Sequence, residues 1–298
     1  MKTDFKKLKI AILGSGNIGT DLLIKSVSSP YLECSLFIGR NMKSPGLTKA
    51  IQMGIPVSDK SIRAIEENYK NIDMIFDATS AIDHIAHWEI LKKLNIPTLD
   101  MTPAKIGILC VPSENMEESA NETNINMITC GGQASIPIAC AIRRAHKDEK
   151  FSYVEVTSSI ASRSAGPATR ANIDEYVDTT EKAIRKFTGA EKSKAILILN
   201  PATPCINMQT SVSVMIEKPN MEKALEEIQK TIAKIQQYVP GYALVVPPTY
   251  DSGRLIATVK VEGKGDYLPK YAGNLDIINC AAISVAEEIA KKKLGLAK

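Results

Sequence analysis

The feature that most constrains the fold of this chain is a glycine-rich turn close to its N-terminus. The predominantly apolar run from Leu8 to Leu13 is followed at once by Gly14-Ser15-Gly16-Asn17-Ile18-Gly19, and an apolar-periodic segment continues to about Val27. In a strand, turn, helix context these glycines let the backbone turn tightly and approach a pyrophosphate, which the amides at the helix start can bind. The sequence therefore predicts a dinucleotide-binding unit. The alternative is a glycine-rich turn that binds nothing.

Strand and helix patterns alternate from this turn to about residue 130, which is typical of a parallel sheet. The expected helix is 83–94, and the expected strands are 34–38, 74–76, 98–101, 108–111 and 124–129. Beyond residue 150 we expect helices at 172–188, 221–238 and 275–290, among strands at 154–159, 195–199, 212–217, 242–246 and 255–262. This second half predicts a mostly antiparallel α+β layer.

We therefore expect an α/β chain with two domains. A Rossmann-like dinucleotide-binding domain would comprise residues 1–130 and 275–298, and an α+β catalytic and dimerisation domain would comprise residues 131–274. The length of 298 residues and the 44% of hydrophobic residues allow a core of this size.

Composition narrows the class of protein further. The net charge of +4 comes from scattered basic residues, which argues against a nucleic-acid surface. The six cysteines show no paired metal spacing and no cleavable signal is recognised, so a reducing compartment is expected. No apolar run reaches the ~18 residues of a membrane span. We expect a soluble cytoplasmic protein without a metal.

The second predicted strand ends where a carboxylate would bind the adenine ribose, about 20 residues beyond the glycines. The residues found there are Gly39, Arg40 and Asn41, with Lys43 nearby. Arg40 could accept a 2′-phosphate, so NADPH is a candidate cofactor beside NADH. In the alternative, Arg40 is merely exposed and Asn41 holds the ribose hydroxyl.

Cys130 lies between a predicted strand and a predicted helix, for which Ser135 is a plausible N-cap with Pro137 in the first turn. A helix start lowers the pKa of a cysteine. The small pair Gly131-Gly132 would let a substrate and backbone amides approach, so that an oxyanion beside the sulfur could be held. Cys130 is therefore a candidate nucleophile at the domain junction, facing a cofactor cleft. The alternative is a buried structural cysteine.

A nucleophilic cysteine beside a nicotinamide fits one reaction type well. The thiolate adds to an aldehyde, the hemithioacetal gives a hydride to the cofactor, and a thioacyl enzyme remains for water, phosphate or coenzyme A to discharge. The alternative is a reductase with no covalent step.

Histidine placement restricts the choice of a base for Cys130. The sequence contains three histidines, His84, His87 and His146. All three precede the second domain, where phosphorylating and semialdehyde dehydrogenases of similar architecture carry the histidine that pairs with their cysteine. We expect His84 and His87 to be surface or satisfied core residues. We expect His146 to be a charge at a helix C-terminus.

Five segments together resemble the acylating acetaldehyde dehydrogenases, and the resemblance spans nearly the whole chain. They are Gly-Ser-Gly-Asn-Ile-Gly-Thr-Asp (14–21), Phe-Asp-Ala-Thr-Ser-Ala (76–81), Met-Ile-Thr-Cys-Gly-Gly-Gln-Ala (127–134), Ser-Ala-Gly-Pro-Ala-Thr-Arg-Ala-Asn-Ile-Asp-Glu (164–175) and Tyr-Leu-Pro-Lys-Tyr-Ala-Gly-Asn-Leu-Asp-Ile (267–277). Long ordered motifs of this kind are far more specific than the glycine turn alone, and they favour Cys130 as the nucleophile.

The resemblance implies an enzyme that interconverts acetaldehyde, NAD⁺ and coenzyme A with acetyl-CoA and NADH, with Cys130 as the acyl-thioester site and a second domain of the semialdehyde dehydrogenase type. It also implies a homodimer, and a 4-hydroxy-2-oxovalerate aldolase as a partner that feeds acetaldehyde through a tunnel, usually in aromatic-compound degradation. The residues that it assigns to cofactor binding are Ser15, Gly16, Asn17, Ile18, Ser164, Ala165, Gly166, Pro167, Ala168, Thr169, Arg170, Ala171, Asn172 and Asn274. Without the family, 164–172 is a loop that could offer amides and Arg170 to an anion.

This chain departs from the family pattern at one position that bears on the mechanism. Where the family has an aspartate thought to assist the cysteine, this chain has Thr210, and no acid occurs between Lys192 and Glu217. Two other functions therefore stay open beside the acylating dehydrogenase. One is a reductase of a larger acyl-CoA in a biosynthetic pathway, and the other is a non-catalytic dinucleotide-binding subunit.

Overall fold

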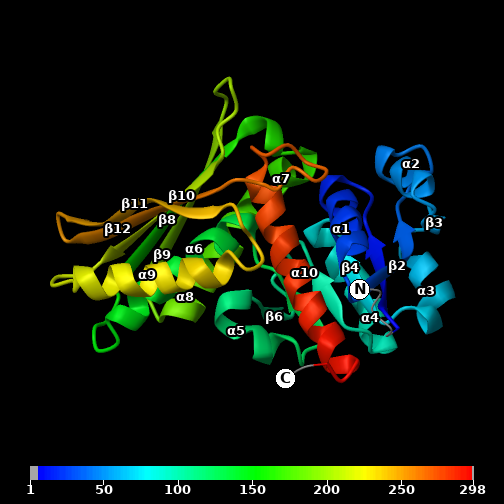
Figure 1. Cartoon of the computed structure of the whole chain (residues 1–298), viewed down its shortest axis with the longest axis horizontal. Helices are drawn as coiled ribbons and strands as arrows, with labels where there is room; N and C mark the ends of the chain where they lie inside the picture. Colours follow the sequence, from blue (N-terminus) through cyan, green and yellow to red (C-terminus); the bar gives the residue numbers. More distant parts are fainter. Residues whose placement is uncertain (1–5, 297–298) are drawn as a thin grey trace. The chain divides into compact units, whose positions relative to one another are not determined.

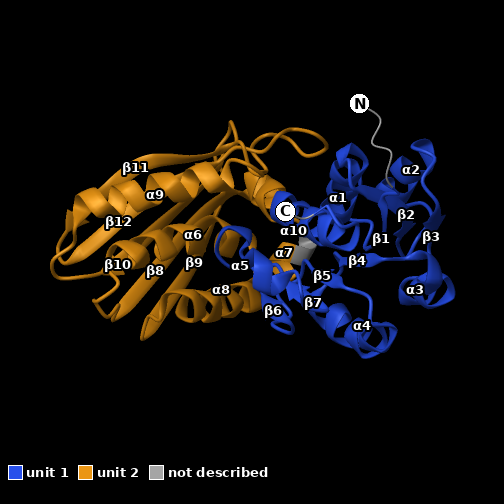
Figure 2. Cartoon of the chain, turned by 60° about the horizontal axis from the view of Figure 1, so that its bottom comes forward, with its two compact units in different colours: residues 1–127, 279–298 blue, residues 128–278 orange. Residues whose placement is uncertain are grey.

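The chain is described by a computed structural model that covers residues 6–296, with the side chains of Pro167 and Ala168 outside the described part. It divides into two compact units (Figure 2). Unit 1 comprises residues 1–127 and 279–298, and unit 2 comprises residues 128–278. The helix α10 (Gly273–Lys293) begins in unit 2 and ends in unit 1.

Unit 1 is built on a seven-stranded sheet in the order β3-β2-β1-β4-β5-β7-β6, and every neighbouring pair is parallel. The strands are β1 Leu8–Leu13, β2 Leu32–Ile38, β3 Val57–Ser58, β4 Met74–Asp77, β5 Thr98–Asp100, β6 Ile108–Leu109 and β7 Asn124–Asn126. The helices of this unit besides α10 are α1 Asn17–Ser28, α2 Pro45–Gln52, α3 Ile62–Asn68, α4 Ala81–Leu94 and α5 Pro112–Ser119. The expected Rossmann-like sheet is confirmed.

The central strands of unit 1 are buried on both faces. Ala11 and Leu13 of β1 belong to one apolar cluster, while Ile10 and Ile12, which alternate with them, are equally inaccessible on the other side of the strand. Parallel strands covered by helices on both faces read as near-continuous apolar runs, and this is the pattern that the sequence shows.

Unit 2 contains a five-stranded sheet in the order β11-β12-β10-β8-β9, in which only β8 and β9 pair in parallel. The strands are β8 Tyr153–Ala161, β9 Lys192–Asn200, β10 Met208–Met215, β11 Tyr242–Asp251 and β12 Arg254–Val261. The helices are α6 Cys130–Ala145, α7 Pro167–Ala171, α8 Ile173–Thr188 and α9 Met221–Ile235. The expectation of a mostly antiparallel α+β layer is confirmed.

Three helices cover one face of the unit 2 sheet, as Figure 1 shows, with α6 packed between α8 and α9. Side chains that alternate along β8, such as Val154, Val156 and Ser158, are buried on this face. On β9 the opposite face leaves Ile196 and Ile198 exposed at 38% and 44%. Within residues 6–296, no helix combines the length and the apolar character that a bilayer crossing needs.

Candidate active site

The glycine turn between β1 and α1 has the geometry that the sequence predicts. Gly14 adopts a φ of +114°, and a Cβ there would lie 2.4 Å from the carbonyl oxygen of Ala78. A Cβ on Gly19 would lie 1.8 Å from the carbonyl oxygen of Gly14, whereas a Cβ on Gly16 would meet no described atom within 4 Å. The glycines thus serve a tight turn, close helix packing and open access for a ligand, as a pyrophosphate-binding turn requires.

The end of β2 lies beside this turn, because the Gly14 amide donates to the Ile38 carbonyl oxygen over 2.9 Å. The side chain of Arg40, two residues further on, is 80% exposed and lies 3.9 Å from the Asp83 carboxylate. Asn41 accepts a hydrogen bond from the Lys43 amide within its own loop. A largely exposed basic side chain, paired only loosely with Asp83, therefore follows the end of β2, and the preference between NADH and NADPH stays a prediction.

Buried polar side chains gather where β4 and β5 end. Oδ2 of Asp77 lies 2.9 Å from Nδ1 of both His84 and His87, while its Oδ1 accepts from Thr79. Burial raises the pKa of Asp77, but the two histidines outweigh it and lower that pKa to about 2. His84 and His87 are buried and hydrogen-bonded, so the satisfied core role expected for them is confirmed.

Asp100 extends this cluster to the next strand. Its Oδ2 lies 3.4 Å from Nε2 of His84 and accepts from the Asn126 amide over 2.6 Å. Burial raises the pKa of Asp100 to about 6, against the lowering effects of His84 and Thr102. Asp77 and Asp100 therefore brace the carboxyl ends of the strands that support the glycine turn, a role that no sequence motif indicated.

The third histidine does not carry the charge expected of it. Nδ1 of His146 lies 2.8 Å from the Ile142 carbonyl oxygen, and its Nε2 accepts the Asn220 amide over 2.9 Å. A nitrogen that accepts an amide proton holds no proton of its own, so the ring is neutral in this arrangement. The expectation of a helix-terminal charge is wrong, because His146 is buried and joins α6 to the start of α9.

In unit 2, Cys130 is the first residue of α6. The N-cap is Thr129, whose hydroxyl oxygen accepts the Gly132 amide over 2.9 Å. The expectation that Ser135 caps the helix, with Pro137 in its first turn, is wrong. The helix already includes both glycines, Pro137 lies inside it, and the Ser135 hydroxyl donates to the Gly131 carbonyl oxygen.

The surroundings of the thiol also differ from the expectation. Cys130 is half-buried, and burial raises the pKa of its thiol to about 11, while hydrogen bonds from the Gly131 amide, the Tyr176 hydroxyl and its own amide lower it by less. The predicted low pKa is wrong for this state, since desolvation exceeds the effect of the helix start. Thr210 is fully buried, and its hydroxyl lies 3.0 Å from that of Ser158.

The segment 164–172 comprises the last residue of a 3-10 turn and the short helix α7, rather than one loop before α8. Ser164 ends a 3-10 turn, Gly166 caps α7, and Asn172 directly precedes α8. The Arg170 guanidinium bonds back to the carbonyl oxygens of Ser162 and Ala165 and is thereby held in its own segment. Of the other predicted cofactor residues, Thr169 and Ala171 lie in α7, and the side chains of Pro167 and Ala168 lie outside the described part.

Asn274 lies in the first turn of α10 and is 1% exposed, yet neither its amide nitrogen nor its oxygen has a hydrogen-bond partner in the described structure. A buried amide without partners is costly, and a ligand that supplies a donor and an acceptor removes this cost. The Asn274 side chain is therefore suited to bind a polar group of a ligand.

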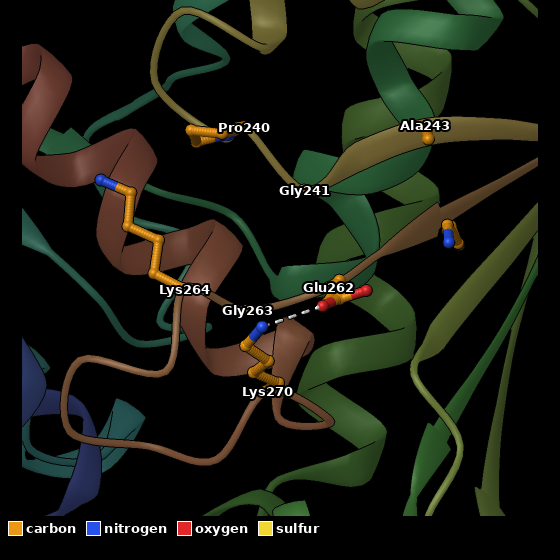
Figure 3. A pocket seen from close by; sticks show the side chains of 8 residues that line it. Pro240, Gly241, Ala243, Glu262, Gly263, Lys264 and Lys270 are labelled. Carbon is orange, nitrogen blue, oxygen red and sulfur yellow. Dashed lines mark ion pairs between the residues drawn. The ribbon is translucent and has the colours of Figure 1, made fainter.

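A shallow hollow of about 440 Å³ in unit 2 is a separate feature (Figure 3). Lys260, Lys264 and Lys270 contribute to its lining, and the Lys270 ammonium lies 3.6 Å from the Glu262 carboxylate. None of the residues predicted to react or to bind the cofactor lines it.

The two units together define a class of protein in which a Rossmann-like unit is joined to an α+β unit that carries a cysteine at a helix start. A family model described as "Prokaryotic acetaldehyde dehydrogenase, dimerisation" matches residues 130–269. The acetaldehyde dehydrogenase of Pectobacterium atrosepticum is 55% identical over 97% of this chain and 98% of its own. That of Spirochaeta aurantia is 53% identical over 96% of each chain, and that of Geobacillus stearothermophilus is 47% identical over 97% and 98%. The chain belongs to the prokaryotic acetaldehyde dehydrogenase family.

Proposed function

We propose that the protein is a CoA-acylating aldehyde dehydrogenase. It would convert acetaldehyde, NAD⁺ and coenzyme A to acetyl-CoA, NADH and a proton, through a thioester on Cys130. The observation that carries this proposal is the position of Cys130 at the first residue of α6, inside the region matched by the family model.

The residues around Cys130 suit the covalent steps. The sulfur attacks the aldehyde carbon to form the hemithioacetal. When bound, the nicotinamide accepts the hydride that leaves this carbon. The thiol of coenzyme A then takes the acyl group and returns the Cys130 sulfur.

The cofactor residues proposed are those of the glycine turn and Asn274. The open space at Gly16 would admit a pyrophosphate, and the Asn274 amide, which has no partner among the described residues, would bond a polar group of the ligand. NAD is the cofactor that we propose, and the exposed Arg40 makes NADP a second possibility.

The proposal extends to assembly. The match to a dimerisation domain supports a homodimer, and the helix-free face of the unit 2 sheet offers apolar side chains for it. A 4-hydroxy-2-oxovalerate aldolase that delivers the aldehyde, and a cytoplasmic location, are further proposals that rest on the family resemblance alone.

The test is the acetyl-CoA-dependent oxidation of NADH by the purified protein, followed by nicotinamide absorbance, with NADPH in parallel. Wild type and Cys205→Ala, which changes another half-buried thiol, should turn over, and Cys130→Ala should not. Equal activity of Cys130→Ala and wild type would refute the thioester mechanism. Turnover only with longer acyl-CoA substrates would favour the larger-acyl reductase, and cofactor binding without turnover on any acyl-CoA would favour a non-catalytic subunit.

A further inference from the structure

A row of hydroxyl groups lies behind Cys130 in unit 2. Tyr176 on α8 contacts Cys130, Ser158 on β8 contacts Tyr176, and Thr210 on β10 contacts Ser158. Tyr176 is 7% exposed, and Ser158 and Thr210 are inaccessible to solvent. Three elements of the fold therefore contribute hydroxyl groups to a row that reaches the sulfur atom through Tyr176.

The backbone of α6 is shaped around the Tyr176 hydroxyl. A Cβ on Gly131 would lie 1.9 Å from the Tyr176 oxygen and 3.0 Å from the Ser158 oxygen. Any side chain at position 131 would therefore displace the tyrosine. The glycine next to the sulfur is required by the hydroxyl row itself.

The turn of α8 that carries Tyr176 is fastened to the start of α6. The Thr180 hydroxyl donates to the Tyr176 carbonyl oxygen over 2.7 Å, so the 2.7 Å contact between Thr129 and Thr180 takes its proton from Thr129. Thr129 also caps α6 by accepting the Gly132 amide, so it fixes the position of Tyr176 relative to the first turn of α6.

The proton positions along the row follow from the same chemistry. A thiolate can only accept, so the Tyr176 hydroxyl donates to sulfur, and its oxygen accepts from the Gly131 amide and from Ser158. Ser158 has then used its one proton, so Thr210 donates to Ser158. Burial raises the pKa of Tyr176 well above its usual range, which keeps this donor protonated.

We propose that Tyr176 donates the hydrogen bond that stabilises the Cys130 thiolate when it forms, and that Ser158 and Thr210 are positioning residues that orient the Tyr176 proton toward sulfur. This inference rests on the proposed function, in which Cys130 is the nucleophile. In this proposal, neutral hydroxyl donors favour the ionisation of the half-buried Cys130 thiol. The groups that shift the pKa of Cys130 within residues 6–296 are Gly131, Tyr176 and its own amide, and none of them is a charged side chain.

The test measures the thiolate directly, without turnover. The rate of Cys130 alkylation by iodoacetamide is followed by mass spectrometry between about pH 6 and 9, in a Cys205→Ala background in which Cys130 is the remaining thiol that is not buried among residues 6–296. This range lies below the thiol pKa of about 11, so the rate is proportional to the thiolate fraction and a change of the midpoint is obtained from the change of rate. Tyr176→Phe should move the midpoint upward by at least about one pH unit, which lowers the rate below the midpoint about tenfold. The matched control is Tyr153→Phe, whose hydroxyl bonds only to Glu155 among described residues, and it should leave the midpoint unchanged.

Two variants at Thr210 test the orientation of the row. Thr210→Val removes the donor to Ser158 and should move the midpoint upward by less than Tyr176→Phe does. Thr210→Asp places a hydrogen-bond acceptor beside Ser158 and turns the Ser158 proton away from Tyr176. This variant should therefore also move the alkylation midpoint upward. In turnover assays with acetyl-CoA, Tyr176→Phe should lower kcat with little change in KM.

An unchanged midpoint in a folded Tyr176→Phe protein, judged by its melting curve, overturns the proposal. If that variant does not fold, Ser158→Ala and Thr210→Val decide in its place, and unchanged midpoints in both overturn it. A shifted midpoint in a protein that shows no turnover with any acyl-CoA would leave the hydroxyl row standing and refute the proposed function. Turnover with an unchanged midpoint would refute the role of the hydroxyl row and leave the proposed function standing.

Discussion

The Asp77 carboxylate takes part in four hydrogen bonds in unit 1, and the substitution Asp77→Asn tests what they contribute to stability. Its Oδ2 serves both His84 and His87, and its Oδ1 serves the amide and hydroxyl of Thr79. An asparagine amide can offer an acceptor on one side only. On the other side its NH₂ group would face donors, which leaves buried polar groups without partners.

The size of the effect follows from the pKa of Asp77. The difference between its usual value of 3.8 and its value of about 2 corresponds to about 2 kcal/mol, at about 1.4 kcal/mol for each pKa unit. The unmatched donors add ~1–3 kcal/mol. We therefore expect Asp77→Asn to lower the free energy of unfolding by about 3–5 kcal/mol, the range for breaking a buried ion pair.

The effect should depend on pH in two directions. The pKa of Asp77 is lowered in the fold, so its contribution is present above pH 3.8 and is lost as the pH falls toward 2. The pKa of His84 is raised by Asp77 and Asp100 although burial opposes this, so its contribution is present below pH 6.5 and is lost as the pH rises through the raised value. The gap between wild type and Asp77→Asn should be widest between about pH 4 and 6.5.

The assay is denaturant unfolding followed by Trp88 fluorescence. Trp88 is the single tryptophan and stacks on His84 with ring centroids 6.4 Å apart, so it reports on this cluster. The control is Asp83→Asn on α4, the helix that also carries Trp88. The Asp83 side chain is 39% exposed, so its charge should contribute less than about 1 kcal/mol to stability. A gap below about 1 kcal/mol, or one that is constant from pH 4 to 9, would refute the reasoning.

Two further predictions concern the cofactor and the assembly. Arg40→Gln should raise the KM for NADPH severalfold and leave the KM for NADH unchanged, because the exposed guanidinium is the group that we propose to bind a 2′-phosphate. Equal effects on both cofactors would contradict this. Ile196→Glu should shift the protein from dimer to monomer in light scattering, since it puts a charge on the helix-free sheet face, whereas Ile82→Glu, at a 78% exposed site in unit 1, should not.

The parts of the fold that the sequence predicted are those with local causes. Each glycine of the first turn has its own steric reason, which explains why the strand, turn and helix lie where the motif indicated. The longer elements with strong periodicity were also placed correctly, within a few residues. The short helices α2, α3 and α5 were not predicted, because seven or eight residues show too little periodicity.

The start of α6 shows how tertiary structure overrides a local signal. Ser135 followed by Pro137 resembles a helix start, and two successive glycines are poor helix formers. The helix nevertheless begins at Cys130, because Thr129 caps it and the Gly131 carbonyl oxygen receives the Ser135 hydroxyl. The buried contacts of this turn outweigh the propensities, and no window of sequence contains them.

The chemistry of Cys130 was the least predictable part for the same reason. Burial raises the pKa of the thiol, and a hydrogen bond from Tyr176, a residue of α8 far along the chain, opposes this rise. Nothing in the spacing between residues 130 and 176 signals that contact. The departure at Thr210 was visible in the sequence, but its connection to the sulfur through Ser158 and Tyr176 was not.

Gly16 and Gly131 show that similar glycines can serve opposite purposes. Both were expected to make room for a ligand, and the space beside Gly16 is indeed open. The space beside Gly131 is taken by the Tyr176 hydroxyl, so this glycine admits a part of the protein to the sulfur rather than a substrate. A substrate that reaches Cys130 must therefore approach from another side. The proposed thiolate donor and the proposed substrate therefore need different sides of the sulfur atom.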